Sequence, residues 1–320
     1  MKDIDWQPSS SMEVLRVRAK FLMKIRKFFY EKGYLEVETP ILSHFGVTDV
    51  YIENIRARSC SKFVYLQSSP EYHMKRLLAF GSGSIFQIAR VFRDNEIGNW
   101  HNPEFTLLEW YCLNINHYQL LDEVEFFLKV FLSCNRLVKK SYKQIFIDYC
   151  DIDPISSSID DLKWILQKNN LESVFYGKDI IDRDQCLYLL MTHVVVPNFT
   201  KEIDEPVAIY DFPLSQALLA QVDKEGFAKR FEIYFKGVEL ANGFNELIDL
   251  NAHIHRFNMN LINRKKMGLD LLEVDYRFLK ALEFGLPVCS GVAIGIDRLL
   301  ALKLGYSKIS DVMSFDFNRC

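Results

Sequence analysis

The sequence contains no C-x-x-C pair, and its seven cysteines are scattered along the chain. Its seven histidines show no zinc-ligand spacing either, because His253 and His255 stand two apart without a partner cluster. These absences argue against a zinc site and against a secreted domain held by disulfides. The cysteines are therefore predicted to be reduced and mostly packed.

Long apolar runs are also missing, since none approaches the ~20 residues that a membrane-spanning helix needs. The N-terminus, MKDIDWQPSSS, carries acidic residues where a secretory signal needs basic residues and an apolar core. We therefore expect a cytoplasmic protein with no membrane partner.

An excess of positive charge is absent as well. The chain has 39 Lys and Arg against 42 Asp and Glu, a formal net charge of -3 over 320 residues. No global basic field therefore draws it to RNA or DNA. The patterns G-x-x-x-x-G-K-[ST] and G-x-G-x-x-G do not occur, so any nucleotide must be held without a P-loop or a Rossmann turn.

Helical periodicity is clearest near the N-terminus. Residues 12–32 place five apolar side chains on one helical stripe, with Gly33 as the stop. The stripe consists of Val14, Val17, Phe21, Ile25 and Phe28. A second helix is predicted to have Ser69 as its cap and Pro70 in its first position, and to end at Gly81.

Strand-like runs joined by short loops alternate with further helices. Strands are predicted at 34–40, 84–92, 102–112, 206–212, 227–246 and 288–294, and helices at 117–133 and 297–304. Residues 134–205 are weakly patterned, with one amphipathic helix at 156–170, and are interpreted as an inserted subdomain. This arrangement predicts an α+β fold, an antiparallel sheet flanked by helices, and argues against a doubly wound sheet.

The strand at 102–111 combines polar and apolar side chains on one face. Alternation puts Phe105, Glu109 and Tyr111 on that face, together with Pro103 and Leu107. A carboxylate and a phenol beside apolar residues suit a pocket for an ammonium group. The alternative is a partly solvated sheet edge.

The stretch RFEIYFKGVELANGFNEL, residues 230–247, predicts a hairpin with Lys236-Gly237 as a two-residue turn. Tyr234 would then face Glu239, and Glu232 would lie diagonally on the same face at roughly 7–8 Å between backbones. Two carboxylates on one face repel unless something positive sits between them. Magnesium bridging phosphate oxygens is one candidate, and two solvated surface glutamates are the alternative.

Glycines at three strand positions predict local departures from regular structure. Gly243 could let its strand bulge and so turn Glu246 towards the two glutamates of the hairpin. Gly291 and Gly295 allow close approach by a ligand backbone or ring. Arg298 follows in the first turn of a helix. The arginine charge and the partial positive charge of the helix N-terminus together suit a phosphate or a stacked purine. A plain tight turn is the alternative.

Three sequence motifs carry a family resemblance. GYLEVETP, FRDNEIGNWHNPEF and GVAIGIDR resemble motifs 1, 2 and 3 of the class II aminoacyl-tRNA synthetases, in order. HNPEFTLLEWY and ELANGFNEL resemble the lysyl branch. The resemblance implies a single class II catalytic domain over 1–320, with the inserted subdomain at about 134–205.

Two features narrow the resemblance to the short elongation factor P–(R)-β-lysine ligases. Only about thirty residues precede GYLEVETP, so we expect no N-terminal anticodon-binding OB domain. Ser69 precedes Pro70-Glu71, where the synthetases tend to have alanine and the ligases serine. These ligases activate a lysine isomer with ATP and attach it to a lysine side chain of elongation factor P, so tRNA is not expected as a partner. The alternatives are a stand-alone lysine-activating enzyme acting on tRNA or a small acceptor, and a catalytically silent regulator.

The resemblance also implies residue roles. Catalytic roles fall to Arg93 and Arg298. Nucleotide contacts are implied for Arg93, Asp94, Asn95, Asn102, Phe105, Glu239, Leu240, Gly295 and Arg298. Contacts to lysine or (R)-β-lysine are implied for Ser69, Pro70, Glu71, Glu109, Tyr111, Asn242 and Glu246. Glu232 and Glu239 are implied to hold magnesium, and residues 12–40 to form a homodimer interface.

Motif 2 departs from the family pattern at one position. The family usually reads Arg-x-Glu, whereas here Arg93, Asp94 and Asn95 are followed by Glu96. Either the Asn95 amide accepts the hydrogen bond from the adenine amino group, without charge assistance, or the loop shifts and Glu96 does so. The motifs do not choose between lysine and (R)-β-lysine, and they do not identify the base that deprotonates the acceptor amine.

Overall fold

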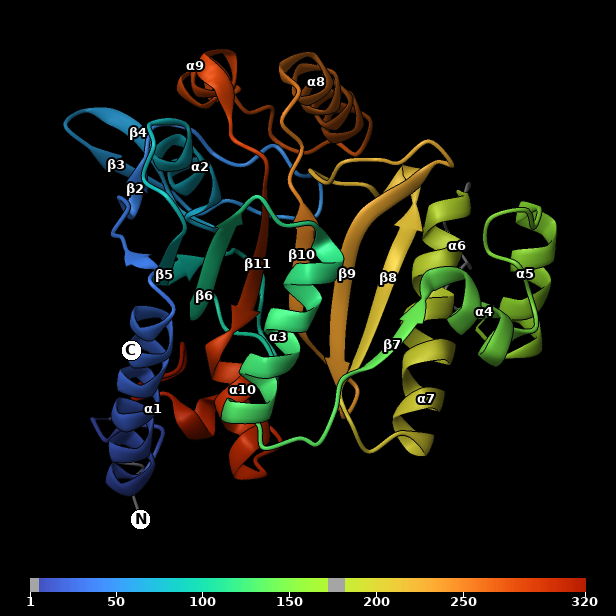
Figure 1. Cartoon of the computed structure of the whole chain (residues 1–320), viewed down its shortest axis with the longest axis horizontal. Helices are drawn as coiled ribbons and strands as arrows, with labels where there is room; N and C mark the ends of the chain where they lie inside the picture. Colours follow the sequence, from blue (N-terminus) through green and yellow to red (C-terminus); the bar gives the residue numbers. More distant parts are fainter. Residues whose placement is uncertain (1–5, 172–181) are drawn as a thin grey trace. The chain divides into compact units, whose positions relative to one another are not determined.

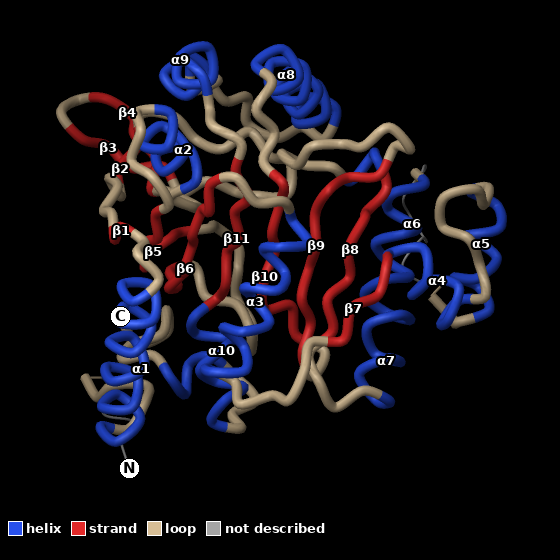
Figure 2. Tube along the Cα trace, viewed as in Figure 1, coloured by secondary structure: helices blue, strands red, loops and turns tan. Residues whose placement is uncertain are grey.

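A computed structural model describes residues 6–171 and 182–320 and has an α+β fold (Figures 1 and 2). The chain divides into two compact units. The first consists of Met1–Asn116 with Glu246–Cys320, and the second of His117–Asn245. In the described part of the chain, no helix combines the length and apolar character that crossing a bilayer requires.

The sheet of the first unit has the strand order β1-β5-β6-β11. Its strands are β1 (Leu35–Glu36), β5 (Ile85–Phe92), β6 (Glu104–Leu113) and β11 (Cys289–Gly295). β5 and β11 both pair antiparallel with β6, and β1 pairs parallel with β5. The strands predicted at 84–92, 102–112 and 288–294 are thus confirmed. The strand predicted at 34–40 is confirmed only at Leu35–Glu36, because the chain leaves the sheet before Pro40.

Five helices and a small second sheet complete the first unit. The helices are α1 (Met12–Glu31), α2 (Glu71–Ala79), α8 (Leu250–Lys266), α9 (Tyr276–Gly285) and α10 (Ile296–Leu304), and a 3-10 turn follows at Ile309–Val312. The second sheet, in the order β2-β4-β3, contains β2 (Leu42–Ser43), β3 (Arg56–Ser59) and β4 (Lys62–Leu66).

The buried face of α1 differs slightly from the predicted stripe. Val14, Phe21 and Ile25 are buried as predicted, but Val17 is exposed. Phe29, not Phe28, continues the buried row at 14, 21 and 25 with a spacing of four. The helix ends before Gly33, whose φ of +78° suits a residue without a Cβ.

The second unit has a sheet in the order β10-β9-β8-β7. Its strands are β7 (Val138–Ser141), β8 (Val207–Pro213), β9 (Phe227–Phe235) and β10 (Val238–Asn245). Its helices are α3 (His117–Phe131), α4 (Tyr142–Cys150), α5 (Ile159–Lys168), α6 (Arg183–Leu190) and α7 (Val196–Glu202), with a π-helical turn at Met191–Val195 and a 3-10 turn at Leu214–Gln216. β7 and β8 are parallel and the other pairs antiparallel.

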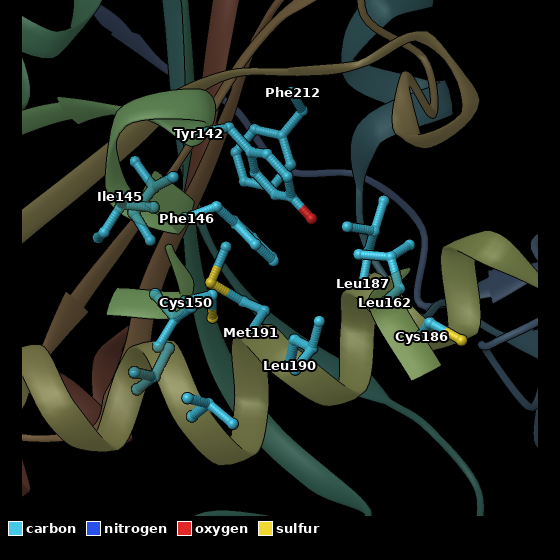
Figure 3. Packing of buried hydrophobic residues seen from close by; sticks show 14 of the residues in the cluster. Tyr142, Ile145, Phe146, Cys150, Leu162, Cys186, Leu187, Leu190, Met191 and Phe212 are labelled. Carbon is cyan, nitrogen blue, oxygen red and sulfur yellow. The ribbon is translucent and has the colours of Figure 1, made fainter. Parts of the chain in front are cut away.

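The weakly patterned stretch 134–205 lies in this unit, and its residues 172–181 are outside the described part of the chain. The predicted helix at 156–170 is confirmed as α5. α4, α6 and the π-helical turn share an apolar core with β8, in which Tyr142 stacks on Phe146 with ring centroids 4.7 Å apart (Figure 3). Such short helices, packed on one another, lack a sharp contrast between polar and apolar faces, which explains the weak periodicity.

Candidate active site

Glu109 lies in a buried polar cluster of the first unit, and its side chain is only 3% exposed. Its Oε1 accepts a hydrogen bond from Ser69 Oγ at 2.6 Å, and its Oε2 accepts one from the Tyr111 hydroxyl at 3.1 Å. Alternation along β6 places Glu109 and Tyr111 on one face, as predicted. The alternative of a solvated sheet edge is wrong for these two residues.

The protonation of this pair follows from its burial. Burial raises the pKa of Glu109 to about 7, although the hydrogen bonds from Ser69 and Tyr111 act in the opposite direction. Burial and the neighbouring Glu109 raise the pKa of the Tyr111 hydroxyl well above its ordinary value, so Tyr111 is a neutral donor. An ammonium group placed here would favour the ionised form of Glu109. The face is therefore suited to a cation.

The start of α2 brings a second carboxylate towards Glu109. Ser69 Oγ accepts a hydrogen bond from Glu71 N at 3.0 Å while it donates to Glu109. The helix begins at Glu71 with Pro70 as the N-cap, one residue later than predicted, so Pro70 is not the first helical residue. The Ser69 hydroxyl still satisfies a backbone donor at the helix start and so links Glu71 to Glu109.

Lys75 was not singled out in the sequence, and it is fully buried. Its Nζ lies 2.5 Å from Glu71 Oε1, one turn earlier on α2, and 2.6 Å from Glu246 Oε2. Both carboxylates raise the pKa of Lys75, against the effect of burial, so it is an ammonium. The i,i+4 spacing of Glu71 and Lys75 could have indicated half of this cluster. Glu246, 171 residues further on than Lys75, could not have been paired with it by any local rule.

Glu246 and Tyr111 occupy space that a glycine leaves. A Cβ on Gly291 would lie 2.4 Å from the Tyr111 ring and 2.6 Å from Glu246 Oε1. The close approach predicted at Gly291 is thus made by the protein's own side chains. Glu246 N donates to Cys289 O at 3.0 Å, which anchors the residue to β11. Burial raises the pKa of Glu246 to about 7 even though Lys75 lowers it.

Arg93 lies beside Phe105 at the far end of the β5–β6 pair. Its guanidinium carbon is 5.1 Å from the centre of the Phe105 ring, close enough for a cation–π contact. Arg93 Nε donates to Ser68 O at 3.4 Å, and Nη1 lies 3.6 Å from Glu96 Oε1. The guanidinium is half-buried and its ion pair with Glu96 is long, so it can take up an anion.

Arg298, in the first turn of α10, is oriented by the loop before β6. Its Nε donates to Trp100 O at 3.0 Å, and Nη2 lies 2.9 Å from His101 Nε2. Burial and the Arg298 charge lower the pKa of His101, so the ring is neutral and accepts this hydrogen bond. A Cβ on Gly295, at the N-cap of α10, would meet Arg298 Cδ at an ordinary 3.5 Å. The lack of a side chain at Gly295 is therefore not required by its protein neighbours.

The loop after Arg93 has a defined geometry around Asn95. Asn95 has a φ of +59°, and its N donates to Asp94 Oδ1 at 2.9 Å. Its Nδ2 donates to Glu53 Oε2 at 3.0 Å. The carboxylate of Glu96 instead lies near Arg93. Asn95 and Glu96 therefore have different partners within the first unit.

Asn102 precedes β6 and is tied to backbone groups on two sides. Its Nδ2 donates to Glu104 O at 2.7 Å, and its Oδ1 accepts from Phe317 N at 2.9 Å. β6 begins at Glu104, so Asn102 and Pro103 lie outside the strand predicted from 102. Asn102 thereby attaches the C-terminal segment to the start of β6.

The β9–β10 hairpin of the second unit confirms the predicted turn and face. Lys236 and Gly237 both have positive φ, at +49° and +77°, as a type I′ turn requires. Tyr234 pairs with Glu239, and a register shift between Glu239 and Ala241 then pairs Asn242 with Glu232. Glu232, Glu239 and Asn242 consequently share one face, and the buried Leu240 lies in the bulge.

The bulge predicted at Gly243 is wrong, since the register shift lies before Ala241. Gly243 is in register with Phe231, and a Cβ there would lie 2.2 Å from the Phe231 ring. The glycine is thus needed for packing in the sheet.

Arg230 joins this face, which the sequence did not indicate. It forms an ion pair with Glu232 and donates to Asn242 Oδ1 at 3.2 Å. The Tyr234 hydroxyl donates to the other oxygen of Glu232 at 2.6 Å. Arg230 itself is buried, with its guanidinium carbon 4.3 Å from the centre of the Phe212 ring. Side chains two apart on one strand share a face, and this could have indicated Arg230.

The two carboxylates, Glu232 and Glu239, fit a magnesium ion that takes its other ligands from phosphate and water. Magnesium accepts oxygen ligands and is usually bound through one or two carboxylates when phosphate is present. Within residues 6–171 and 182–320, no group of three or more His, Cys, Asp or Glu side chains is arranged to hold a metal ion. The donor set therefore suits a shared magnesium and not an all-protein metal site.

The family model for class II tRNA synthetases (D, K and N) matches residues 2–319. The chain belongs to this family. Curated relatives named elongation factor P–(R)-β-lysine ligase resemble it over nearly their whole length. The protein from Pasteurella multocida (strain Pm70) is 47% identical over 97% of each chain. Those from Haemophilus influenzae (strain PittGG) and Histophilus somni (strain 2336) are 48% and 46% identical over 97% and 98% of each chain.

Proposed function

We propose that this chain is an ATP-dependent ligase that activates (R)-β-lysine, or lysine, as an adenylate and transfers it to a lysine side chain of elongation factor P. The observation that carries the proposal is the 46–48% identity, over 97–98% of each chain, to relatives that bear this ligase's name. The buried cluster around Glu109 supports it, because the cluster suits an aliphatic diamine.

The amino acid binds in this cluster. Glu109, Tyr111 and Glu246 hold the ammonium at the far end of its side chain, and Glu71 holds the amino group nearer the carboxylate. Both sets of contacts are charge-assisted hydrogen bonds in a buried site, where they are strong. Ser69 donates to the Glu109 carboxylate and accepts from the backbone N of Glu71, so it positions one carboxylate and the residue that bears the other. Pro70 completes the contacts from the first unit, and the family resemblance implies a further contact from Asn242.

Adenylation needs positioning and charge, and no covalent attachment to the protein. A carboxylate oxygen of the amino acid attacks the α-phosphorus of ATP, and pyrophosphate leaves. Arg93 stabilises the negative charge that builds on the α-phosphate. Phe105 and Arg298 sandwich the adenine. The remaining nucleotide contacts come from Asp94, Asn95, Asn102, Leu240 and Gly295, with Asn95 or Glu96 at the adenine amino group.

Glu232 and Glu239 would hold magnesium, which neutralises charge on the pyrophosphate when it is bound. Tyr234 keeps Glu232 oriented through its 2.6 Å hydrogen bond, and Arg230 holds Asn242 beside it. Arg230 also forms an ion pair with Glu232, so that this carboxylate is held from both of its oxygens.

Transfer follows when the acceptor lysine amine attacks the acyl carbon of the adenylate. An amide forms, AMP leaves, and the amine loses a proton. Because a free lysine amine has a pKa of about 10.4, a base must take that proton before or during attack. A carboxylate of the site or a phosphate oxygen can serve as this base.

The proposed reaction consumes ATP and modifies a translation factor, so we propose that the enzyme is cytoplasmic.

We also propose a homodimer through residues 12–40. The exposed apolar side chains of α1, among them Met12, Met23 and Tyr30, support this. Light scattering of the purified protein at micromolar concentration tests it. A monomer would contradict the homodimer without touching the catalytic proposal.

The decisive experiment is ATP–pyrophosphate exchange with lysine and with (R)-β-lysine, followed by mass spectrometry of elongation factor P and a tRNA-charging assay. We expect exchange, a mass gain on elongation factor P and no charged tRNA. Arg93→Ala should abolish exchange. Arg90→Ala, three residues earlier and in a half-exposed ion pair with Glu104, is the matched control and should retain it. Charged tRNA without a mass gain on the factor would overturn the proposal.

A further inference from the structure

Lys75 has no part in the reaction described above, although its ammonium lies among the carboxylates that hold the substrate. It is 0% exposed, and its Nζ is 2.5 Å from Glu71 and 2.6 Å from Glu246. Burying an ammonium is costly unless it is paired on all sides. A position that needed only an apolar filler would be served better by methionine or leucine. Packing alone therefore does not explain why an ammonium is buried at this position.

The charges of the pocket explain why an ammonium is buried here. Glu71, Glu109 and Glu246 carry three negative charges when ionised, and Lys75 carries one positive charge, which leaves two negative charges. Lysine and its β-isomer each bring two ammonium groups, while their carboxylate is directed to Arg93 and the α-phosphate. The pocket with Lys75 thus balances the substrate's cationic groups, and the pocket without Lys75 would not.

Neighbouring titratable groups leave this balance unchanged. Burial together with the Lys75 charge lowers the pKa of His253 to about 4, so it is neutral. Burial and Glu246 raise the pKa of the Cys289 thiol to about 12, so it is neutral too. Tyr111 is a neutral phenol. Lys75 is consequently a cation in direct contact with two of the pocket carboxylates, Glu71 and Glu246.

Lys75 also keeps two of those carboxylates apart and fixed. Glu71 and Glu246 are 175 residues apart in the sequence and meet at one ammonium. Without that ammonium they would repel each other in a buried site, and one would take up a proton. A protonated Glu246 would be a poor partner for the distal ammonium of the substrate.

We propose that Lys75 is a specificity-determining residue of the amino-acid pocket: its ammonium sets the pocket charge at two negative and fixes Glu71 and Glu246, so that the pocket selects amino acids with two ammonium groups. The inference rests on the proposed function, since it assumes a lysine isomer as the substrate. Lys75 acts through the two carboxylates and does not touch the reacting atoms.

The test compares Lys75→Met with wild type in exchange assays between pH 6 and 9. Lysine and (R)-β-lysine serve as substrates, and norleucine, which lacks the distal ammonium, serves as a competitive inhibitor. We expect the KM for both isomers to rise about 10- to 100-fold, the value of one or two charge-assisted hydrogen bonds. The Ki of norleucine should rise less, because norleucine keeps the amino group that Glu71 holds but lacks the ammonium that Glu246 holds, so the preference for two ammonium groups falls.

The pH profile separates this role from a purely structural one. Binding of an ammonium requires ionised carboxylates, so 1/KM in wild type should rise with pH through about 7, where Glu246 titrates. Lys75→Met should move this transition to higher pH, because the charge that lowers the pKa of Glu246 is gone. Lys75→Arg, which keeps the charge, should retain the wild-type transition. A merely structural ion pair would lower the melting temperature and leave the profile in place.

Lys139→Met is the matched control. Lys139 likewise bridges two carboxylates, Asp122 at 2.6 Å and Glu125 at 2.9 Å, but it lies in the second unit and on the surface. The Lys139→Met variant should leave both KM values and the pH profile unchanged.

If Lys75→Met does not fold, Lys75→Gln, which can still donate to one carboxylate, is expected to show the same changes in KM and pH profile. An unchanged lysine KM and pH profile in the folded variant would overturn the inference, whereas absence of exchange in wild type with either isomer would overturn the proposed function.

Discussion

Nη1 of Arg18 on α1 lies 2.6 Å from Oδ1 of Asp297 in the first turn of α10, and both side chains are largely buried. Asp297 Oδ2 also accepts a hydrogen bond from Thr106 N at 2.7 Å, and Arg18 Nη2 donates to Thr106 Oγ1 at 2.8 Å. One ion pair thus ties α1, β6 and α10 together directly before Arg298. Helix α1 therefore supports the start of α10, which carries the Arg298 that is proposed to contact the nucleotide.

This ion pair predicts a large and specific loss of stability. Arg18→Ala leaves Asp297 buried without its cation, which should lower the free energy of unfolding by about 3 kcal/mol. Arg26→Ala, on the same helix but in an exposed pair with Glu36, should cost at most about 1 kcal/mol. Urea denaturation measures both. Equal losses in the two variants would show that the buried pair has no special role.

Glu109 predicts a pH dependence of stability. Its pKa is raised from 4.5 to about 7 in the folded protein, so the folded state binds more protons than the unfolded state in this window. Stability therefore falls as pH rises from about 4.5 through 7, by up to about 3 kcal/mol for this group. Glu109→Gln should remove that loss and make the substrate-free protein more stable at pH 8 but not at pH 4.5. It should also raise the lysine KM.

The control for Glu109 is Glu104→Gln on the same strand. Glu104 is partly exposed and paired with the equally accessible Arg90, so its substitution should change stability little at either pH. Urea denaturation at the two pH values distinguishes the variants. A Glu109→Gln effect of the same size at both would contradict the assignment of burial as the cause.

Gly291 predicts separate effects on the two substrates. In Gly291→Ala the new Cβ would overlap the Tyr111 ring and Glu246, so the KM for lysine should rise about tenfold or more. The KM for ATP should stay close to that of wild type. Gly295→Ala, whose Cβ meets only Arg298 at 3.5 Å, should leave the lysine KM unchanged. Exchange kinetics with each substrate varied in turn checks both, and a raised ATP KM alone in Gly291→Ala would refute the placement.

Glu239 predicts a changed requirement for magnesium. Glu239→Gln removes one of the two charged oxygen ligands, so half-maximal exchange should need about tenfold more Mg²⁺. Glu225→Gln, an exposed glutamate in a turn of the same unit, should not change the requirement. Titration of exchange activity with Mg²⁺ measures this. An unaltered titration curve for Glu239→Gln would remove Glu239 from the metal site.

Local periodicity explains the parts of the site that were predicted correctly. A strand repeats every two residues, so Glu109 and Tyr111 could be placed on one face from their spacing. The Lys236-Gly237 turn likewise sets the register of its hairpin, which puts Glu239 opposite Tyr234. The helix over Met12–Glu31 and the α+β class rest on the same kind of short-range regularity.

Other parts depend on where a strand deviates from regularity. The extra residue in β10 lies at Leu240 and not at Gly243, and it brings Asn242 opposite Glu232. A glycine signals that a bulge is tolerated, but Gly243 is explained instead by the ring of Phe231. Which position of a strand bulges is decided by packing across the sheet, and the sequence of one strand does not contain that information.

The sequence by itself determined the family, the main helices and strands of the first unit and the carboxylates proposed for the amino-acid pocket, because motifs and periodicities act over a few neighbouring residues. Only the tertiary structure decided that Lys75 meets Glu246 and that Arg18 meets Asp297, pairs separated by 171 and 279 residues. Such pairs form because a buried charge must find an opposite charge nearby in space, wherever in the chain that charge is encoded.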